Sequence, residues 1–196
     1  MTHPGRYSLS PARQKLVESL ESCRAVDAPE EKDRRRMIHL LVTEAACFDR
    51  GHFVPGHFTA SGFLLAPDHS GLLLIHHKKL GRWLQPGGHA LPNEDDPLEM
   101  VKREIEEETG IVDIEVKTPT PFDLDIHRIP AKGNEPAHEH FDIRYLFLVN
   151  DPTQVRRCYE ETNDIRWFTW DELAATALDP GMMRVVAKVR GHHPDR

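Results

Sequence analysis

The amino-acid sequence predicts an α/β protein in which a mixed β-sheet lies between helices. Strand patterns come first, one strongly patterned helix follows at about 97–109, and further strands precede a closing helix at about 181–189. Two amphipathic segments within residues 1–50 add an N-terminal helical extension. The 196 residues, 39% hydrophobic and 29% charged, suffice for one well-cored domain with such an appendage.

Each element follows from its own local pattern. Amphipathic periodicity predicts helices over about 10–25 and from about 29 to 47. The turn-rich stretch at 51–56 marks a boundary, so we place the helical extension at 1–50 and the main domain at 51–196. The extension is expected to pack on the main domain or on a partner subunit, and a homodimer through the helix pair is left open. Extended apolar segments predict strands at 58–65, 72–77, 112–116, 122–129, 141–149 and 165–168.

Charge and cysteine content argue against several classes of function. The net charge is −7 without a long basic run, which speaks against nucleic acid as the main partner, although a metal-bound nucleotide remains compatible. The three cysteines form no C-x-x-C pair, so neither a zinc knuckle nor a redox dithiol is indicated. The first ten residues lack an apolar targeting segment, and the longest aliphatic run, 72–75, is too short to cross a bilayer. A cytoplasmic protein without a membrane partner is expected.

The helix at 97–109 is framed by its own sequence. Asp96 is a plausible N-cap, Pro97 occupies the first helical position, and Glu99 completes a pattern typical of a capping box. Gly110 is expected to end the helix in a left-handed conformation.

Three acids recur on one side of this helix. Glu104, Glu107 and Glu108 stand at i, i+3 and i+4, a spacing at which like charges repel unless a cation lies among them. Clustered carboxylate oxygens suit a hard divalent ion, so the triplet indicates Mg²⁺ or Mn²⁺. The alternative is a solvated charged face with Lys102 and Arg103 as counterions.

The pattern from Gly88 to Ile111 resembles the signature of the Nudix hydrolases, G-x5-E-x7-R-E-U-x-E-E-x-G-U, where U is aliphatic. One extra residue lies in the first half, so either Glu94 or Asp95 takes the first acidic position. The preceding segment, W-L-Q-P-G-G, resembles the lead-in of that family. The residues of the second half are all in register: Arg103, Glu104, Ile105, Glu107, Glu108, Gly110 and Ile111.

The resemblance covers about 58–187 and implies a Nudix-type α/β/α sandwich. It implies Mg²⁺- or Mn²⁺-dependent hydrolysis of a nucleoside diphosphate linked to another group, giving a nucleoside monophosphate and a phosphorylated product. Glu104, Glu107 and Glu108 would hold the metal with a carbonyl of the glycine loop, assigned to Gly88. Arg103 would orient a glutamate by a salt bridge, and Glu107 or Glu104 would act as the base.

Further site residues are expected outside the helix. By the same resemblance Glu161, or else Glu160, would reach the metal, and the alternative is a solvated loop charge. The chain has 13 histidines, and on a strand His138 and His140 would share one face, a spacing that can bind a transition metal. Because two histidines make an incomplete shell, a role in substrate contacts is preferred to a zinc site. The substrate-binding candidates are His89, His127, His138, His140 and Arg82.

Three rival functions use the same fold. A non-catalytic nucleotide-sensing or binding module would usually have lost part of the acid triplet, which this chain keeps whole. An isoprenoid-diphosphate isomerase would need a cysteine in the pocket, and none lies near the signature in sequence. An enzyme that removes RNA caps would be expected to have a basic surface. A hydrolase of a small nucleotide diphosphate therefore remains the favoured interpretation.

Overall fold

The computed structural model describes residues 9–191 of the chain. It confirms the predicted α/β class with a mixed sheet and with two helices ahead of the first strand. The chain divides into two compact units. Unit 1 contains the described part of Met1–Ser61 with Gly87–Glu104 and Thr118–Tyr145, and unit 2 contains Gly62–Pro86, Ile105–Lys117 and the described part of Leu146–Arg196.

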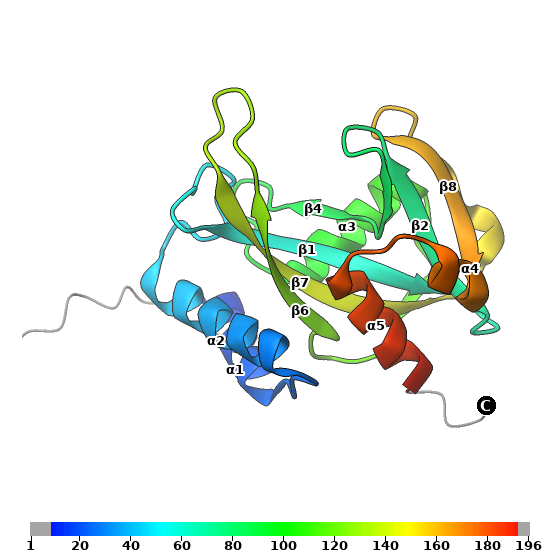
Figure 1. Cartoon of the computed structure of the whole chain (residues 1–196). Coiled ribbons are helices and arrows are strands. Elements are labelled where there is room, and N and C mark those ends of the chain that lie inside the picture. Colours follow the sequence, from blue (N-terminus) through cyan, green and yellow to red (C-terminus); the bar gives the residue numbers. More distant parts are fainter. Residues whose placement is uncertain (1–8, 192–196) are drawn as a thin grey trace, which may run out of the picture. The chain divides into compact units, whose positions relative to one another are not determined.

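Unit 1 combines the N-terminal helices with strands that carry five of the 13 histidines. Within it β4 pairs antiparallel with β1, and β6 pairs antiparallel with β7. Three of its elements, β1, α3 and β7, continue into unit 2. The elements are α1 Pro11–Ser22, α2 Ala28–Thr43, β1 Gly56–Leu65, β4 Gly87–His89, α3 Pro97–Thr109, β6 Asp123–Ile129 and β7 His138–Val149 (Figure 1).

The N-terminal helices are capped and packed within unit 1. The side chains of Ser10 and Asp27 each accept a backbone N–H of the first turn, at 3.2 and 2.8 Å, and so replace partners that a helix N-terminus lacks. α2 packs on β6, where Asp33 Oδ2 accepts the backbone N–H of Ile126 at 3.0 Å. The extension therefore packs on strands of its own chain, the first of the two expected arrangements. The predicted domain boundary after residue 50 stays a prediction.

The strands of unit 1 are apolar on one face and polar on the other. Phe58 of β1 lies 5.0 Å from Phe48 and 5.8 Å from Phe141 of β7 between ring centroids, and all three are buried. Because side chains alternate along a strand, the neighbours of Phe58 and Phe141 point to the opposite face. The pairing registers place these residues on that polar face: His57, Thr59, Ser61, His89, Asp123, Asp125, His127, His138, His140, Asp142 and Arg144.

Unit 2 is built around a fully apolar strand. Every side chain from Leu72 to Ile75 is at most 1% exposed, and β2 is paired with both β3 and β8. Thr169 caps α4 through a reciprocal capping box with Glu172. The elements of unit 2 are β2 Gly71–His77, β3 Arg82–Leu84, β5 Ile114–Val116, the 3-10 turn Pro152–Gln154, β8 Thr162–Thr169, α4 Trp170–Ala175 and α5 Pro180–Gly191.

Several strands begin earlier than their apolar patterns indicate. The glycine loop opens as β4, and β7 starts at His138 rather than at Phe141. β8 likewise starts at Thr162, three residues before its apolar stretch. In each case a neighbouring strand supplies the backbone hydrogen bonds, so polar residues enter the ladder although their side chains give no apolar signal.

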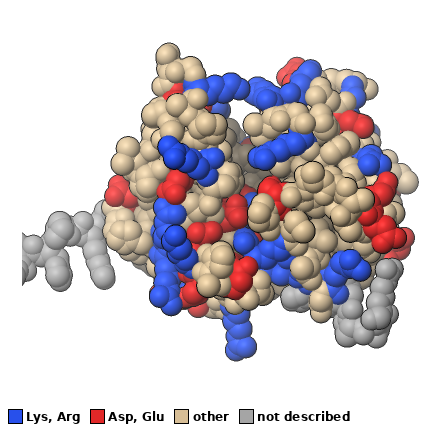
Figure 2. All heavy atoms as spheres, in the orientation of Figure 1, with Lys and Arg blue, Asp and Glu red and all other residues tan. Residues whose placement is uncertain are grey.

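The surface carries charges of both signs. Acidic side chains are scattered among lysines and arginines on the face drawn in Figure 2, in keeping with a net charge of −7. None of the helices within residues 9–191 combines the length and the apolar character that crossing a bilayer requires.

Candidate active site

The helix that carries the predicted signature begins and ends as its sequence indicates. Asp96 accepts backbone N–H groups through Oδ1 from Leu98 and through its carbonyl from Met100, both at 3.0 Å. Gly110 has φ +70°, the left-handed conformation expected after a helix. The expected capping role of Glu99 is replaced by a contact with Lys102 at 2.7 Å. α3 is thus held at both ends within the bounds that the sequence predicts.

The acid triplet is not a uniformly solvated face. The Glu104 side chain is 12% exposed and Glu108 is 2% exposed, whereas Glu107 is exposed. Lys102 pairs with Glu99 on the same helix, and Arg103 contacts Glu104. Two of the three acids are therefore shielded from solvent, and a cation-binding role for the triplet stays a prediction.

Arg103 ties the helix to the loop in front of it. Its guanidinium donates to Glu104 Oε1 at 2.8 Å, to Glu94 Oε2 at 2.9 Å and to the carbonyl of His89 at 3.0 Å. Burial opposes the charge of Arg103, but the two carboxylates outweigh it and raise the pKa of the guanidinium above its ordinary range. Asp95 instead accepts the hydroxyl of Ser10 at 2.6 Å. Of the two candidates for the first acidic position, Glu94 therefore contacts the signature arginine.

The glycine pair lets β4 lie close to its neighbours. A Cβ on Gly88 would stand 2.5 Å from Glu104 Oε1, and one on Gly87 would stand 2.5 Å from the carbonyl of Ala60 in β1. Both distances are shorter than real Cβ contacts. Gly88 therefore lets β4 lie close to Glu104, and Gly87 lets it lie close to the backbone of β1.

The loop before β8 is anchored to the end of α3 within unit 2. The backbone N–H groups of Arg156 and Cys158 donate to the carbonyls of Thr109 and Glu108, at 2.7 and 3.4 Å. Glu160 and Glu161 follow in this loop with exposed side chains, so a place for Glu161 at the metal stays a prediction. Cys158 nevertheless lies beside the signature helix, which corrects the inference from sequence distance. Cys158 is far from α3 in the sequence but close to it in space, because the loop folds back onto the helix.

The structure brings most of the predicted histidines together. His89, His138 and His140 line one cavity of about 70 Å³, and ring centroids of His127 and His140 are 5.5 Å apart. Arg82 is an exposed residue of β3 in unit 2 and is not among the residues lining this cavity. Substrate roles for these five residues stay predictions.

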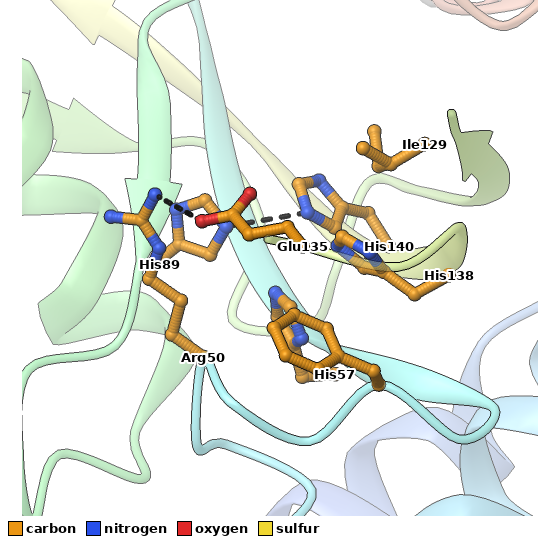
Figure 3. A pocket seen from close by; sticks show the side chains of 8 residues that line it. Arg50, His57, His89, Ile129, Glu135, His138 and His140 are labelled. Carbon is orange, nitrogen blue, oxygen red and sulfur yellow. Dashed lines mark hydrogen bonds and ion pairs between the residues drawn. The ribbon is translucent and has the colours of Figure 1, made fainter. Parts of the chain in front are cut away.

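Sequence reasoning missed His57, which is 1% exposed on β1. Its ring centroid lies 5.0 Å from those of His138 and His140 and 5.1 Å from that of His89 (Figure 3). The alternation of polar and apolar residues from His57 to Ser61 was the available signal, because it marks a strand with one polar face.

Burial lowers the pKa of three of the clustered imidazoles. Desolvation, followed by the neighbouring charged groups, lowers the pKa of His140 to about 2 and that of His89 to about 4. Burial also lowers the pKa of His57. Burial therefore disfavours the protonated form of these three rings, in a cavity whose lining also includes Arg50 and Glu135, an ion pair at 3.5 Å.

A buried charge cluster lies on the same polar face. Arg144, with a side chain 3% exposed, contacts one carboxylate oxygen each of Asp142, Asp125 and Asp123, at 2.8, 3.0 and 3.3 Å. Asp125 also contacts Nδ1 of His127 at 3.0 Å. Three carboxylates face one guanidinium, so the cluster offers a net negative field to any cation nearby.

Comparison with known families identifies the chain. A family model described as NUDIX domain matches residues 56–189. The chain belongs to the Nudix family. A search of curated protein sequences finds no match. The family prediction is therefore confirmed, and with it, at the level of the family, the prediction of a hydrolase acting on acid anhydrides.

Solved structures share the fold at low sequence identity. A C. elegans Ap4A hydrolase in a binary complex is 19% identical with a TM-score of 0.56, over 69% of this chain and 96% of that one. A NUDIX family hydrolase from Clostridium perfringens is 21% identical with a TM-score of 0.52, over 70% and 98%. The NUDIX domain of Shewanella oneidensis NrtR, complexed with ADP ribose, is 17% identical with a TM-score of 0.50, over 69% and 86%. These likenesses concern the Nudix fold and leave the substrate open.

Proposed function

We propose that this Nudix protein hydrolyses the phosphoanhydride bond of a nucleoside diphosphate linked to another group. The observation that carries the proposal is the acid triplet of α3, in which Glu104 and Glu108 are shielded while Glu107 is exposed. Shielded carboxylates at helical spacing fit Mg²⁺ or Mn²⁺, which prefer oxygen ligands. Nudix enzymes generally use a divalent metal, which is consistent with this choice.

Each residue of the proposed site has its own role in the reaction. Glu104, Glu107 and Glu108 would hold the metal with the carbonyl of Gly88. A bound divalent ion would offset charge on the diphosphate oxygens and lower the pKa of a coordinated water. Arg103 holds the Glu104 carboxylate in place. Because Arg103 already occupies Glu104 Oε1, the exposed Glu107 is the better acceptor for the proton of the attacking water.

The substrate class is the finer part of the proposal. Two similar structures are named for Ap4A hydrolysis and for a complex with ADP ribose, and both compounds contain an adenosine joined to a second group through a phosphate bridge. A substrate screen therefore begins with Ap4A, ADP ribose and compounds of the same kind. The net charge of −7 favours such a small molecule over an RNA end.

Turnover by the purified protein tests the proposal. Phosphate release is measured with Mg²⁺ or Mn²⁺ over nucleotide sugars, ADP ribose, dinucleoside polyphosphates and nucleoside triphosphates, and a nucleoside monophosphate is the expected product. Glu107→Gln is expected to fold normally and to lose most turnover. Glu106→Gln is the matched control, because Glu106 is exposed on the same helix outside the triplet.

Equal activity in the two variants would remove the proposed chemistry from α3. Tight nucleotide binding by the native protein without any turnover would favour the nucleotide-sensing alternative.

A further inference from the structure

The cavity of unit 1 contains three histidines whose ring nitrogens are close together. His57 comes from β1, and His138 and His140 come from β7, all on the polar face of the strands. One nitrogen of each ring can be chosen so that the three atoms lie within 4.8 Å of one another. Figure 3 shows these rings and that of His89 turned toward a common space.

Backbone carbonyls determine which nitrogen of two rings is free. Nδ1 of His57 lies 3.1 Å from the carbonyl of His52, and Nδ1 of His138 lies 2.8 Å from the carbonyl of Pro136. A carbonyl oxygen only accepts, so both Nδ1 atoms carry the hydrogen and both Nε2 atoms keep a lone pair. This outer hydrogen bond is the one that metal-binding histidines usually make.

The lone pair of His57 has no protein donor. Its Nε2 atom is buried and has no hydrogen-bond partner among residues 9–191. A buried acceptor without a partner is unfavourable, and native structures rarely retain one without water or an ion beside it. Here the orphaned atom lies in the same cavity as the rings of His138 and His140.

The Nε2 atoms of His89 and His140 lie close enough together to bind the same ion. His89 Nε2 and His140 Nε2 form a hydrogen bond 3.3 Å long. With metal–nitrogen bonds of about 2.0–2.1 Å, two ligands of a tetrahedral ion are separated by about 3.4 Å. The cavity of about 70 Å³ has room for one ion with a water.

We propose that His57, His138 and His140 bind one first-row transition-metal ion of the zinc class, with His89 or a water in the fourth position. Nitrogen ligands select such ions, whereas carboxylates select Mg²⁺ or Mn²⁺. The buried carboxylate cluster around Arg144 favours a cation on this face. This third histidine from β1 completes the shell that the pair on β7 lacks.

This site is distinct from the acid triplet of α3. Gly88 and His89 are consecutive residues of β4, so their side-chain directions point to opposite faces of the strand. The direction of Gly88 meets Glu104, and the ring of His89 lines the cavity. The inference therefore does not rest on the proposed hydrolysis.

Zinc stoichiometry tests the proposal directly. The full-length protein is stripped with a chelator and titrated with Zn²⁺ in competition with a chromogenic chelator, and we expect one tightly bound ion per chain. Co²⁺ is expected to bind the stripped protein with the intense visible absorption of a tetrahedral site. Absence of stoichiometric Zn²⁺ binding, or a Co²⁺ spectrum of an oxygen-ligated octahedral ion, would overturn the inference.

Variants locate the bound ion. His140→Asn is expected to reduce stoichiometry from one ion to near zero, and His39→Asn on α2 is the matched control that retains it. Glu107→Gln is expected to retain full zinc binding even where it abolishes turnover, which separates this site from the catalytic one. Equal zinc binding by His140→Asn and the control would place the ion elsewhere. Should His140→Asn fail to fold by circular dichroism, the Co²⁺ spectrum of the native protein decides alone.

Discussion

Replacing Gly88 by alanine should separate catalysis from folding. The added Cβ would stand 2.5 Å from Glu104 Oε1, while ordinary contacts begin at 3.4 Å, so the carboxylate must retreat by about 1 Å. Because the obstructing atoms are the end of a flexible side chain, the backbone of β4 can stay in place. A displacement of about 1 Å at a reacting centre reduces turnover roughly 100-fold.

The neighbouring glycine supplies the contrast. A Cβ on Gly87 would meet the carbonyl of Ala60 and the Cα of Ser61 at 2.5 and 2.6 Å, and this backbone cannot move without disturbing the pairing of β1 with β4. We expect Gly87→Ala to lower the free energy of unfolding by about 1–3 kcal/mol. For Gly88→Ala we expect a change within about 1 kcal/mol, because the reduced freedom of the unfolded chain offsets the side-chain shift.

Urea denaturation and metal-dependent phosphate release are measured on both variants. The expected result is a folded Gly88→Ala protein with a deep loss in kcat and a destabilised Gly87→Ala protein. Native turnover in Gly88→Ala would refute the reasoning, because Glu104 would then have no positional role. Equal destabilisation of the two variants would show that the clash with Glu104 cannot be relieved locally.

Three further predictions concern the surrounding structure. Arg103→Lys loses the planar fork that contacts two carboxylates. Urea denaturation should therefore give a free energy of unfolding lower by about 1–3 kcal/mol, and kcat should fall. An unchanged free energy of unfolding and an unchanged kcat would contradict the bridging role. Burial lowers the pKa of His89 to about 4 and that of His140 to about 2, so below pH 6.5 the unfolded chain binds protons that the folded one does not. The melting temperature of the metal-free protein should therefore be highest above pH 6.5 and fall as the pH drops toward 4, and a flat profile would contradict the burial of these rings. Asp33→Ala should destabilise the protein by about 1–3 kcal/mol through the lost contact with β6, with Glu18→Ala, at an exposed position, as a neutral control in the same unfolding assay.

The parts of the fold that sequence predicts best are those governed by local rules. The bounds of α3 follow from Asp96 and Gly110, whose conformations depend on their immediate neighbours. The capping box at Thr169 is equally local. The strand at Leu72–Ile75 is recognisable because burial on both faces demands an unbroken apolar run.

The parts of the fold that depend on contacts between distant segments are harder to predict from the sequence. The beginning of β7 at His138 is set by its partner β6, which no local apolar pattern reveals. The fold of the loop at Cys158 onto α3 is likewise a long-range contact. The alternation from His57 to Ser61 places His57 on a polar strand face but does not show which residues lie beside it. Only the alignment of β1 with β4 and β7 brings this ring to the other histidines.

The acid triplet lies between these two cases. The spacing of Glu104, Glu107 and Glu108 follows directly from helical geometry, and so does the idea of a cation among them. Their unequal exposure does not, because it depends on which side of α3 the rest of the protein covers. The different roles that we propose for Glu104 and Glu107 rest on that inequality.

The most direct test of the account locates the catalytic metal itself. Crystals soaked with Mn²⁺ and a non-hydrolysable analogue of ADP ribose are measured at a wavelength where manganese scatters anomalously. The account predicts an anomalous peak coordinated by the carboxylates of α3 and by the diphosphate of the analogue. A peak elsewhere, with Glu104, Glu107 and Glu108 making no contact with the ion, would contradict it.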